Sequence, residues 1–365
     1  MPMRIAYVVG ARPNIVKMAP VLAALRRRAP EARHALIHTG QHYDRLLSGV
    51  PFEDLGVPTP DHMLGVGSGS HSQQIARTMA RLEPVLVREH PDLVIVAGDV
   101  NSTLATALTT RHLGLPLAHV ESGLRSFDRT MPEELNRILT DRMSDHLFVH
   151  CADAVAQLRR EGVDDERIRF VGNTMIDSLV AMEPRFRAAD YASQLGCNRQ
   201  DYLLVTLHRP ALVDTALLFD VMGELRKLSR ELPVLFPMHP RTRKALSGFD
   251  SGPGVQLLDP LGYVQFLSLE SDARAVLTDS GGVQEETTFL GVACFTLRDN
   301  TERPITVTRG TNTLLGLKPA RIADIIPALD GPRPALDGPP QLWDGRAAER
   351  VAEVIAIDGP EVGVR

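Results

Sequence analysis

Short apolar runs alternate with longer helical patterns along the whole chain. In the first half the runs cover residues 4–10, 34–40, 93–99, 115–121, 145–151 and 168–172, and in the second half residues 202–208, 234–239, 255–258, 273–279 and 293–297. Helical patterns fill the gaps, for example over residues 14–28, 70–89 and 103–113. This alternation predicts an α/β fold in which parallel sheets are covered by helices on both faces.

Two successive sets of strands predict two doubly wound domains. We expect the first domain over residues 1–178 and the second over residues 179–340, with the connection between Ile176 and Gln200, where a charged helical stretch follows the sixth strand. The 365 residues are enough for two domains of ordinary size. A last amphipathic helix is expected over residues 344–357, after a Pro/Gly-rich segment.

Composition argues against several classes of protein. No apolar run is long enough to cross a bilayer, and the apolar N-terminus runs into a turn without a cleavage site, so no membrane association or signal peptide is expected. The three cysteines lie far apart in the sequence, so no disulfide framework is expected. This absence favours a protein of the reducing cytoplasm. The formal net charge of −5 argues against nucleic acid as the main partner.

The segment Asp279–Glu286 is the most informative part of the sequence. It follows an apolar run, contains two glycines and opens a helical stretch, which indicates a strand, a tight turn and a helix N-terminus. Such a terminus presents free backbone N–H groups that bind phosphate, and a carboxylate one turn later can accept hydrogen bonds from a ribose diol. Alternatively, Ser280 is only an N-cap, and Glu285 and Glu286 only complement the helix dipole.

Ionisable residues follow the other expected strands as well. Ligands of doubly wound sheets bind at the carboxyl ends of strands. The sequence places these residues there or in the next loop: Arg12, Lys17, Asp99, Glu121, Arg125, Glu133, Arg137, His208, His239 and Arg241. Each also has a simpler interpretation, because Asp99 could cap a helix and the Glu–Arg pairs at i, i+4 could be structural. Their recurrence at nearly every strand end favours a shared site.

The sequence contains no dinucleotide or metal-binding motif. Gly10 stands alone after the first expected strand, so GxGxxG is absent, and the run over residues 65–70 is not a P-loop. The twelve histidines do not fall into HExxH or HxH spacing. We therefore expect neither a metal nor a cofactor.

An ordered set of short motifs resembles the UDP-N-acetylglucosamine 2-epimerase family over nearly the whole chain. The motifs are Gly10–Val21, Thr39–His42, Gly98–Thr103, His119–Arg125, Pro132–Arg137, Gly172–Asp177, His208–Arg209, His239–Arg241, Asp279–Glu286 and Thr301–Pro304. The resemblance implies a GT-B architecture, with two Rossmann-like domains, the active site in the cleft between them and a C-terminal helix that packs back on the first domain. It also implies a cytoplasmic homodimer that serves polysaccharide biosynthesis.

The resemblance also assigns roles to individual residues. Catalysis is implied for Asp99, Glu121, Glu133 and His208. Binding of the UDP-sugar is implied for Arg12, Lys17, Arg137, Phe266, Ser280, Gly281, Gly282, Glu286 and Arg303. Among these, the residues 280–282 and Arg12 would hold the diphosphate, Glu286 the ribose and Phe266 the uracil. The implied reaction converts UDP-GlcNAc to UDP-ManNAc by elimination of UDP to a glycal and re-addition on the opposite face, with no cofactor.

The sequence departs from the family pattern at several positions. Asn14 and Ile305 stand where many members have Glu, and Pro210–Leu212 replaces the phrase x-Glu-Asn. Gln41 and His42 of an activator pocket are present, but residues 63–74 contain no Arg, which argues against activation by a second substrate molecule. A related UDP-2-acetamido sugar, a hydrolysing 2-epimerase that releases UDP and free ManNAc, and a GT-B glycosyltransferase remain alternatives.

Overall fold

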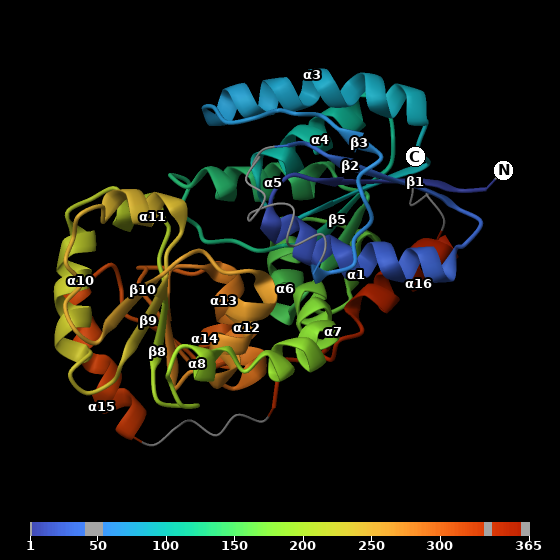
Figure 1. Cartoon of the computed structure of the whole chain (residues 1–365). Coiled ribbons are helices and arrows are strands. Elements are labelled where there is room, and N and C mark those ends of the chain that lie inside the picture. The colour runs from blue at the N-terminus through green and yellow to red at the C-terminus, as the bar shows by residue number, and fades with distance from the viewer. Residues whose placement is uncertain (1, 41–53, 332–337, 359–365) are drawn as a thin grey trace. The chain divides into compact units, whose positions relative to one another are not determined.

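The computed structural model describes residues 2–40, 54–331 and 338–358 (Figure 1). Its internal contacts divide the chain into two units. Unit 1 runs to Ala181 and includes the segment from Gln341 onward, and unit 2 spans Met182–Pro340. Helix α7 (Thr174–Ala189) crosses the boundary between the two units in the sequence.

Unit 1 is built on a parallel sheet with the strand order β3-β2-β1-β4-β5-β6-β7. The strands are β1 (Arg4–Val9), β2 (Arg33–His38), β3 (His62–Met63), β4 (Leu93–Ala97), β5 (Leu117–Ser122), β6 (His146–Val149) and β7 (Ile168–Phe170). The connecting helices are α1 (Arg12–Arg28), α3 (His71–Glu89), α4 (Asn101–His112), α5 (Pro132–Met143), α6 (Ala152–Arg160) and the short η2 (Asp165–Arg167), and α16 (Ala347–Asp358) comes last. The strand order reverses between β1 and β4, which is where doubly wound sheets bind ligands.

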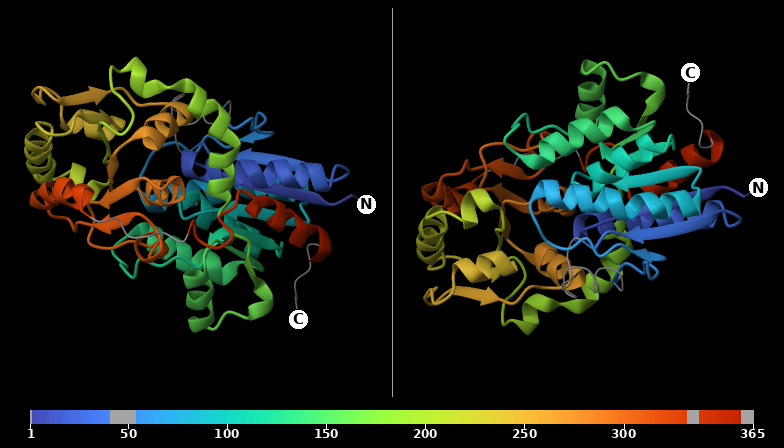
Figure 2. Two further views of the ribbon diagram at one scale, coloured as in Figure 1. Left: turned by 90° about the horizontal axis from the view of Figure 1, so that it is seen from below. Right: turned by 90° about the horizontal axis from the view of Figure 1, so that it is seen from above.

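Successive residues of β1 face opposite sides of this sheet. Ile5, Tyr7 and Val9 pack in one core cluster with residues of α1 and α16. Ala6 and Val8 pack on the other side with residues of α3 and α4. Figure 2 shows α1 and α16 side by side on the sheet face that they share. Because both faces are covered, the strand is apolar from Ile5 to Val9, in agreement with the sequence pattern.

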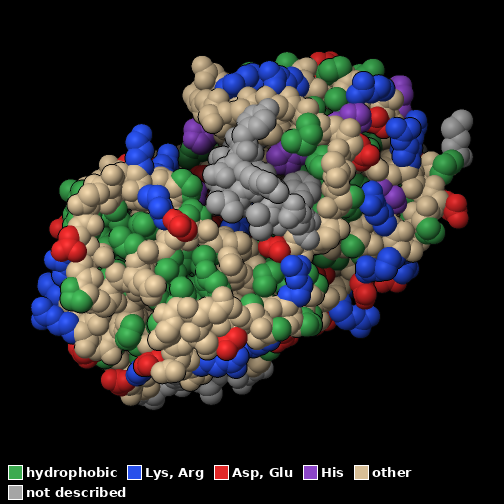
Figure 3. Space-filling view, in the orientation of Figure 1, with side chains coloured by type: hydrophobic (Ala, Val, Ile, Leu, Met, Phe, Trp, Pro, Cys, Tyr) green, Lys and Arg blue, Asp and Glu red, His purple; other side chains and the backbone are tan. Residues whose placement is uncertain are grey.

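Helix α3 shows how local sequence sets the limits of an element. The Ser70 hydroxyl accepts a hydrogen bond from the Gln73 N–H (3.3 Å), and the Gln73 side chain accepts one from the Ser70 N–H (3.2 Å), so the helix begins with a capping box. It ends at His90, which has a left-handed backbone. Lys and Arg side chains lie over α3 in Figure 3, and the helix carries Arg81 and Arg88 on its exposed face. Its buried face packs on the sheet.

Unit 2 repeats the same topology with the strand order β10-β9-β8-β11-β12-β13. The strands are β8 (Leu203–Thr206), β9 (Val234–Pro237), β10 (Val255–Leu258), β11 (Ala275–Thr278), β12 (Ala293–Thr296) and β13 (Asn312–Leu314). The helices are α8 (Tyr191–Gln194), α9 (Pro210–Val213), α10 (Leu217–Leu228), α11 (Pro240–Ala245), α12 (Tyr263–Asp272), α13 (Gly281–Leu290), α14 (Ile305–Thr308), η3 (Pro319–Asp324) and α15 (Ile325–Asp330). Here the order reverses between β8 and β11.

The two faces of the unit 2 sheet carry separate cores. Leu203 and Val205 of β8 pack with α10 and α15, whereas Leu204 packs with α8, α12 and α13. Both units are therefore Rossmann-like parallel-sheet domains of the kind that make up the GT-B class. Within the described ranges, no helix is both long enough and apolar enough for a bilayer crossing.

The structure differs from the sequence predictions mainly at short elements. The strands β3 and β13 were not predicted, because two or three residues give no readable apolar run. Helix α16 begins at Ala347 and not at residue 344. The Asp177 carboxylate of α7 accepts hydrogen bonds from the N–H groups of Ala347 (3.1 Å) and Ala348 (2.6 Å), so a distant residue sets this helix start.

Candidate functional site

In unit 1 the candidate residues lie at the carboxyl ends of three neighbouring strands, β1, β4 and β5. The loop after β1 leads into α1, whose first residue Arg12 is half-buried. Asp99 follows β4, and Glu121 lies near the end of β5. Since β1, β4 and β5 are adjacent and parallel, these side chains share one edge of the sheet.

Lys17 and Glu121 form a buried ion pair at this edge. The Lys17 Nζ contacts the Glu121 Oε2, and only 6% and 5% of the two side chains are exposed. The backbone of Glu121 is left-handed, with φ +68°, a conformation that is unusual for a residue other than glycine. The turn beside it contains Gly98, where an added Cβ would lie 3.2 Å from the Lys17 Nζ and 3.3 Å from the Glu121 Oε2. The left-handed backbone at Glu121 and the close approach of Gly98 thus place the Glu121 carboxylate beside Lys17.

Arg137 of α5 holds the Asp99 carboxylate. Its Nε and Nη2 lie 3.0 and 2.9 Å from the Asp99 Oδ2, and its Nη1 lies 2.5 Å from Glu134. Glu134 is buried and also accepts hydrogen bonds from the N–H groups of Ser126 and Phe127, so it fixes the loop after β5. Glu133, by contrast, is half-buried and forms no ion pair or side-chain hydrogen bond with the described part of the chain. The i, i+4 pair of Glu133 and Arg137 is therefore not formed.

Asp141 is a supporting residue that sequence reasoning missed. Its Oδ1 lies 2.7 Å from the His119 Nδ1, and its Oδ2 accepts hydrogen bonds from the Gly123 N–H (3.0 Å) and from Arg125 (2.7 Å). Burial opposes the charge on Asp141, but His119 and Arg125 outweigh it and hold the pKa of Asp141 below its usual value. Arg125 also pairs with Glu161 (2.8 Å) and not with Glu121. The network ties the end of β5, and hence Glu121, to α5.

In unit 2, Asp279 joins the two strand ends at which the sheet order reverses. It follows β11, and its Oδ2 accepts hydrogen bonds from the backbone N–H groups of His208 and Arg209 after β8, both at 2.8 Å. Its Oδ1 lies 2.9 Å from the His208 Nδ1. Burial raises the pKa of Asp279, but the nearby His208 and these hydrogen bonds overcome it, and the net pKa is lowered. Asp279 therefore positions the His208 ring, which stays partly exposed.

The N-terminus of α13 has the features of an anion site. Ser280 is its N-cap residue, but its side chain makes no capping hydrogen bond, and Gly281 and Gly282 begin the helix. A Cβ at Gly281 would lie only 2.1 Å from the Arg303 Nη1, so a glycine is required for the arginine to reach the helix start. Arg303 is buried, and its Nε lies 3.0 Å from Glu285. Free N–H groups and a fixed guanidinium can together hold a phosphate.

Further arginines lie beside Arg303. Glu302 contacts Arg303, lies 2.7 Å from Arg298, and lies 3.7 Å from Arg209. Burial lowers the pKa of Arg298 in spite of the Glu302 charge. Apart from Arg303, sequence reasoning did not select these residues as site residues, and the Arg209–Glu302 pair gives no local signal, because its partners are about ninety residues apart.

Glu286 lies one turn into α13 and is buried. Its Oε1 accepts a hydrogen bond from the Tyr263 hydroxyl at 2.9 Å, which links α13 to α12. Phe266, on the same helix α12, is half-buried against the core cluster of that sheet face. Glu286 therefore does more than complement the helix dipole, since a buried tyrosine orients it.

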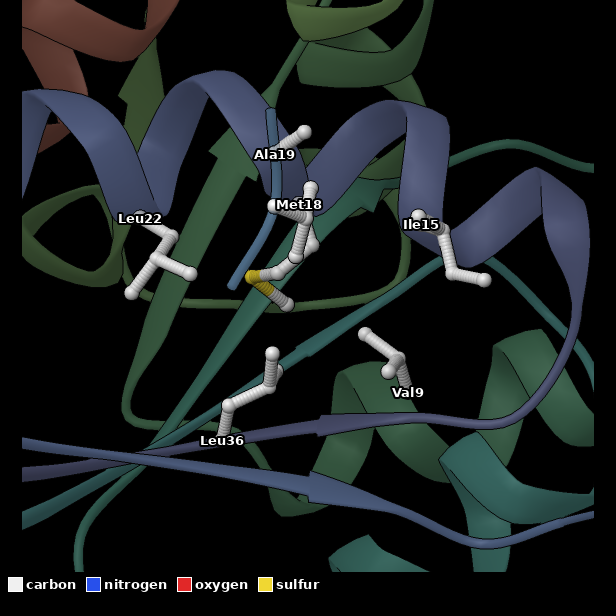
Figure 4. A pocket seen from close by; sticks show the side chains of 7 residues that line it. Val9, Ile15, Met18, Ala19, Leu22 and Leu36 are labelled. Carbon is white, nitrogen blue, oxygen red and sulfur yellow. The ribbon is translucent and has the colours of Figure 1, made fainter. Parts of the chain in front are cut away.

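Two further findings bear on the candidate chemistry. Across the described residues, no group of three His, Cys, Asp or Glu side chains could hold a metal ion. A pocket under α1 is lined only by apolar side chains. It is therefore part of the core and unsuited to a charged ligand. Figure 4 labels six of the lining side chains: Val9, Ile15, Met18, Ala19, Leu22 and Leu36. Gln41 and His42 lie outside the described residues.

Two Rossmann-like sheets, an uncapped helix N-terminus beside an arginine, and carboxylates at strand ends are typical of nucleotide-sugar enzymes with a GT-B fold. A model of the family described as UDP-N-acetylglucosamine 2-epimerase matches residues 23–356. The chain belongs to this family.

Three relatives illustrate the range of the similarity. UDP-N-acetylglucosamine 2-epimerase of Methanococcus maripaludis is 40% identical over 336 residues, which cover 88% of this chain and 90% of that protein. UDP-2,3-diacetamido-2,3-dideoxy-D-glucuronate 2-epimerase of Pseudomonas aeruginosa is 39% identical over 360 residues, which cover 97% and 99%. The solved structure of Methanocaldococcus jannaschii UDP-GlcNAc 2-epimerase in complex with UDP-GlcNAc and UDP has a TM-score of 0.90 at 37% identity, and the match covers 97% of this chain and 100% of that one.

Proposed function

We propose that the chain epimerises C2 of a UDP-2-acetamido sugar, with unit 2 binding UDP and unit 1 supplying the acid and base groups. The observation that carries the proposal is the α13 N-terminus, which lacks a side-chain cap and has Arg303 fixed against Gly281. The family membership and the complex of the M. jannaschii relative with UDP-GlcNAc and UDP support it.

The chemistry explains why both sets of residues are needed. The C2 proton of the sugar is not acidic, because no carbonyl activates that carbon. In the proposed route UDP leaves C1 while a carboxylate removes the C2 proton, and the glycal then takes a proton on the opposite face as UDP returns. Positive groups stabilise the leaving diphosphate; here these are Arg12, His208, Arg303 and the helix N-terminus.

We assign the proton transfers to Asp99, Glu121 and Glu133. The structure gives the three carboxylates different surroundings: Asp99 faces Arg137, Glu121 faces Lys17, and Glu133 is half-buried. Different surroundings allow one carboxyl group to act as an acid while another acts as a base. In this scheme Lys17 and Arg137 set the charge and the orientation of the carboxylates.

The exact substrate is UDP-GlcNAc or a UDP-2,3-diacetamido uronate. The second candidate is favoured by the P. aeruginosa relative, whose match covers 97% of this chain. The departure at Asn14 is compatible with either sugar, because its amide binds the carbonyl of Ala97 (2.5 Å) and its oxygen accepts from Gly10 (3.4 Å). Comparing kcat/KM for the two UDP-sugars would distinguish the candidates.

NMR of UDP-GlcNAc with the protein in D₂O tests the reaction class. We expect deuterium at C2 and formation of UDP-ManNAc, because elimination exchanges the C2 proton with a base that is linked to solvent. Free ManNAc with UDP would identify a hydrolysing enzyme. Transfer of the sugar to an acceptor, with the C2 proton retained, would contradict the proposal and favour a glycosyltransferase. The same sample, passed over a size-exclusion column with light scattering, tests the homodimer that we also propose.

A further inference from the structure

The imidazole ring of His119 connects the two strand ends that carry Asp99 and Glu121. His119 belongs to β5 and is fully buried, two residues before Glu121. Its Nε2 lies 2.8 Å from the carbonyl oxygen of Gly98, the residue directly before Asp99. A carbonyl oxygen can only accept a hydrogen bond, so Nε2 carries a proton and donates it to Gly98. A side chain of β5 thus holds the backbone that leads to Asp99.

The other ring nitrogen of His119 meets Asp141 of α5. The His119 Nδ1 lies 2.7 Å from the Asp141 Oδ1. A bare nitrogen and an ionised oxygen are both acceptors and would repel each other at this distance, so a proton lies between them. The second oxygen of Asp141 accepts hydrogen bonds from the Gly123 N–H (3.0 Å) and from Arg125 (2.7 Å). These donors favour the ionised carboxylate, so both protons of the pair reside on His119, which is an imidazolium.

The charges around this imidazolium are balanced. The side chains of His119 and Asp141 are 0% and 1% exposed, and Arg125 pairs with both Asp141 and Glu161. Two cations therefore face two anions in one buried network. Buried charges persist in proteins when each has a partner of opposite sign and its hydrogen bonds are made. Among the described residues, Asp141 is the one ionisable partner of the ring itself.

Gly98 is held by β5 at both of its backbone polar groups. Its N–H donates to the Val120 carbonyl (3.0 Å), and its carbonyl accepts from His119. Its φ is +67°, a left-handed turn that glycine adopts readily. After this turn the carbonyl of Asp99 accepts a hydrogen bond from the Asn136 amide of α5 (2.8 Å). The course of the chain at Asp99 therefore depends on the His119 contact.

We infer that His119 is a positioning residue, which through its two N–H groups fixes Gly98, and hence Asp99, relative to α5 and to Glu121 on its own strand. This inference rests on the proposed function, in which Asp99 and Glu121 move protons at one carbon atom. Two groups that act on the same carbon must keep a constant separation. A displacement of about 1 Å can lower turnover on the order of 10²-fold. Asp141 acts one step further away, because it sets the orientation of the His119 ring.

NMR of the protein labelled with ¹⁵N-histidine tests the two protons without any assay of activity. Both ring nitrogens of His119 should give the shifts of a protonated imidazole from about pH 6 to about pH 8, across the range in which free histidine loses its charge. The spectrum of His119→Gln lacks these signals and so assigns them. A bare nitrogen at either position would overturn the inference, because one of the two fixed contacts would lack its donor.

Two variants separate the two contacts of the ring. Asn is one atom shorter than Gln, so His119→Asn keeps an N–H donor for Asp141 but no longer reaches the Gly98 carbonyl, whereas His119→Gln reaches Gly98. The kcat with UDP-GlcNAc or the UDP-2,3-diacetamido uronate should fall roughly 10- to 100-fold in His119→Asn and less than about tenfold in His119→Gln. In the proposed function unit 2 binds UDP, so calorimetry should give UDP affinities within about threefold of the wild type for both variants.

His62→Gln is the matched control for the loss of a histidine contact in unit 1. The His62 Nε2 lies 2.9 Å from the buried Glu89, and this pair connects β3 to α3 without a candidate site residue. The control should lower the melting temperature and leave kcat per folded molecule unchanged. Wild-type kcat in His119→Asn, or an equal loss of kcat in His62→Gln, would overturn the inference. So would a UDP affinity that falls in proportion to kcat, since that pattern indicates a general structural defect.

The outcomes also separate the inference from the proposed function. A wild-type protein that epimerises neither UDP-sugar would overturn the proposed function, whereas the NMR signals of His119 would still be those of a doubly protonated ring. Melting temperatures show whether the variants fold. If His119→Asn does not fold, the comparison of His119→Gln with His62→Gln and the NMR measurement still decide the inference: a kcat loss in His119→Gln no larger than in the control would overturn it.

Discussion

Replacing Lys17 with Met isolates the charge at the centre of unit 1. The Lys17–Glu121 pair is buried, with side-chain exposures of 6% and 5%. Met has a similar length and fills the same space, so the variant removes the ammonium group without opening a large cavity. Glu121 is then left as a buried carboxylate without its lysine partner.

The expected cost is large. Removing one partner of a buried ion pair destabilises proteins by about 3–5 kcal/mol, because the remaining charge stays desolvated. A typical domain has only about 5–15 kcal/mol of stability in total, so the loss is readily measured. Turnover should fall as well, because the charge state of Glu121 and its position both depend on the ammonium group.

Urea unfolding and steady-state kinetics of matched variants test this reasoning. Arg28→Met is the control, because the Arg28–Glu353 pair in the same unit is 3.6 Å long, with exposures of 47% and 56%, and exposed pairs contribute about 0–1 kcal/mol. The double variant Lys17→Met with Glu121→Gln removes the remaining carboxylate charge as well. It should recover part of the stability but none of the turnover.

Two results would refute this account of unit 1. A Lys17→Met protein that unfolds at the same urea concentration as the wild type would show that the pair contributes little. A double variant that is no more stable than Lys17→Met would show that the Glu121 charge is not the cause of the loss.

Three further predictions concern binding, pH and metal ions. Glu286→Ala should weaken UDP binding in calorimetry, because each hydrogen bond to the charged group contributes roughly 1.5–3 kcal/mol; unchanged affinity would leave it a dipole complement. Burial raises the pKa of Asp177 from 3.8 to about 6, so from pH 4 to 6 the wild type should lose roughly 2 kcal/mol of unfolding free energy relative to Asp177→Asn; parallel urea profiles would contradict this. Dialysis against EDTA should leave turnover intact, and recovery of a lost activity by Mg²⁺ would count against the proposal.

The sequence predicts the layered part of the fold well, because buried parallel strands leave continuous apolar runs. Strand β11 and the turn at Ser280 follow directly from an apolar run and two glycines. The same reasoning fails for β3, whose two residues belong to the sheet only through pairing with β2. Local patterns specify what a segment can form, and pairing with distant segments decides the short cases.

Charge partners are harder to predict than elements. The spacing of Glu121 and Arg125 suggests a helical ion pair, yet Glu121 lies in a strand, where residues four apart do not contact through one turn. Its partner Lys17 is 104 positions away in the sequence. The Asp141 network was missed for the same reason, since His119 and Asp141 meet only after β5 and α5 pack together.

The glutamates around the start of α13 have different hydrogen-bond and ion-pair partners. Glu285 and Glu302 pair with arginines near this helix start, Glu285 with Arg303 and Glu302 with Arg298 and Arg209. A diphosphate that arrives there meets guanidinium groups that need not reorganise, which is the condition for strong electrostatic stabilisation of a leaving group. Glu286, the residue after Glu285, accepts a hydrogen bond from the Tyr263 hydroxyl. Under the proposed function, the arginines would meet the diphosphate and Glu286 the ribose.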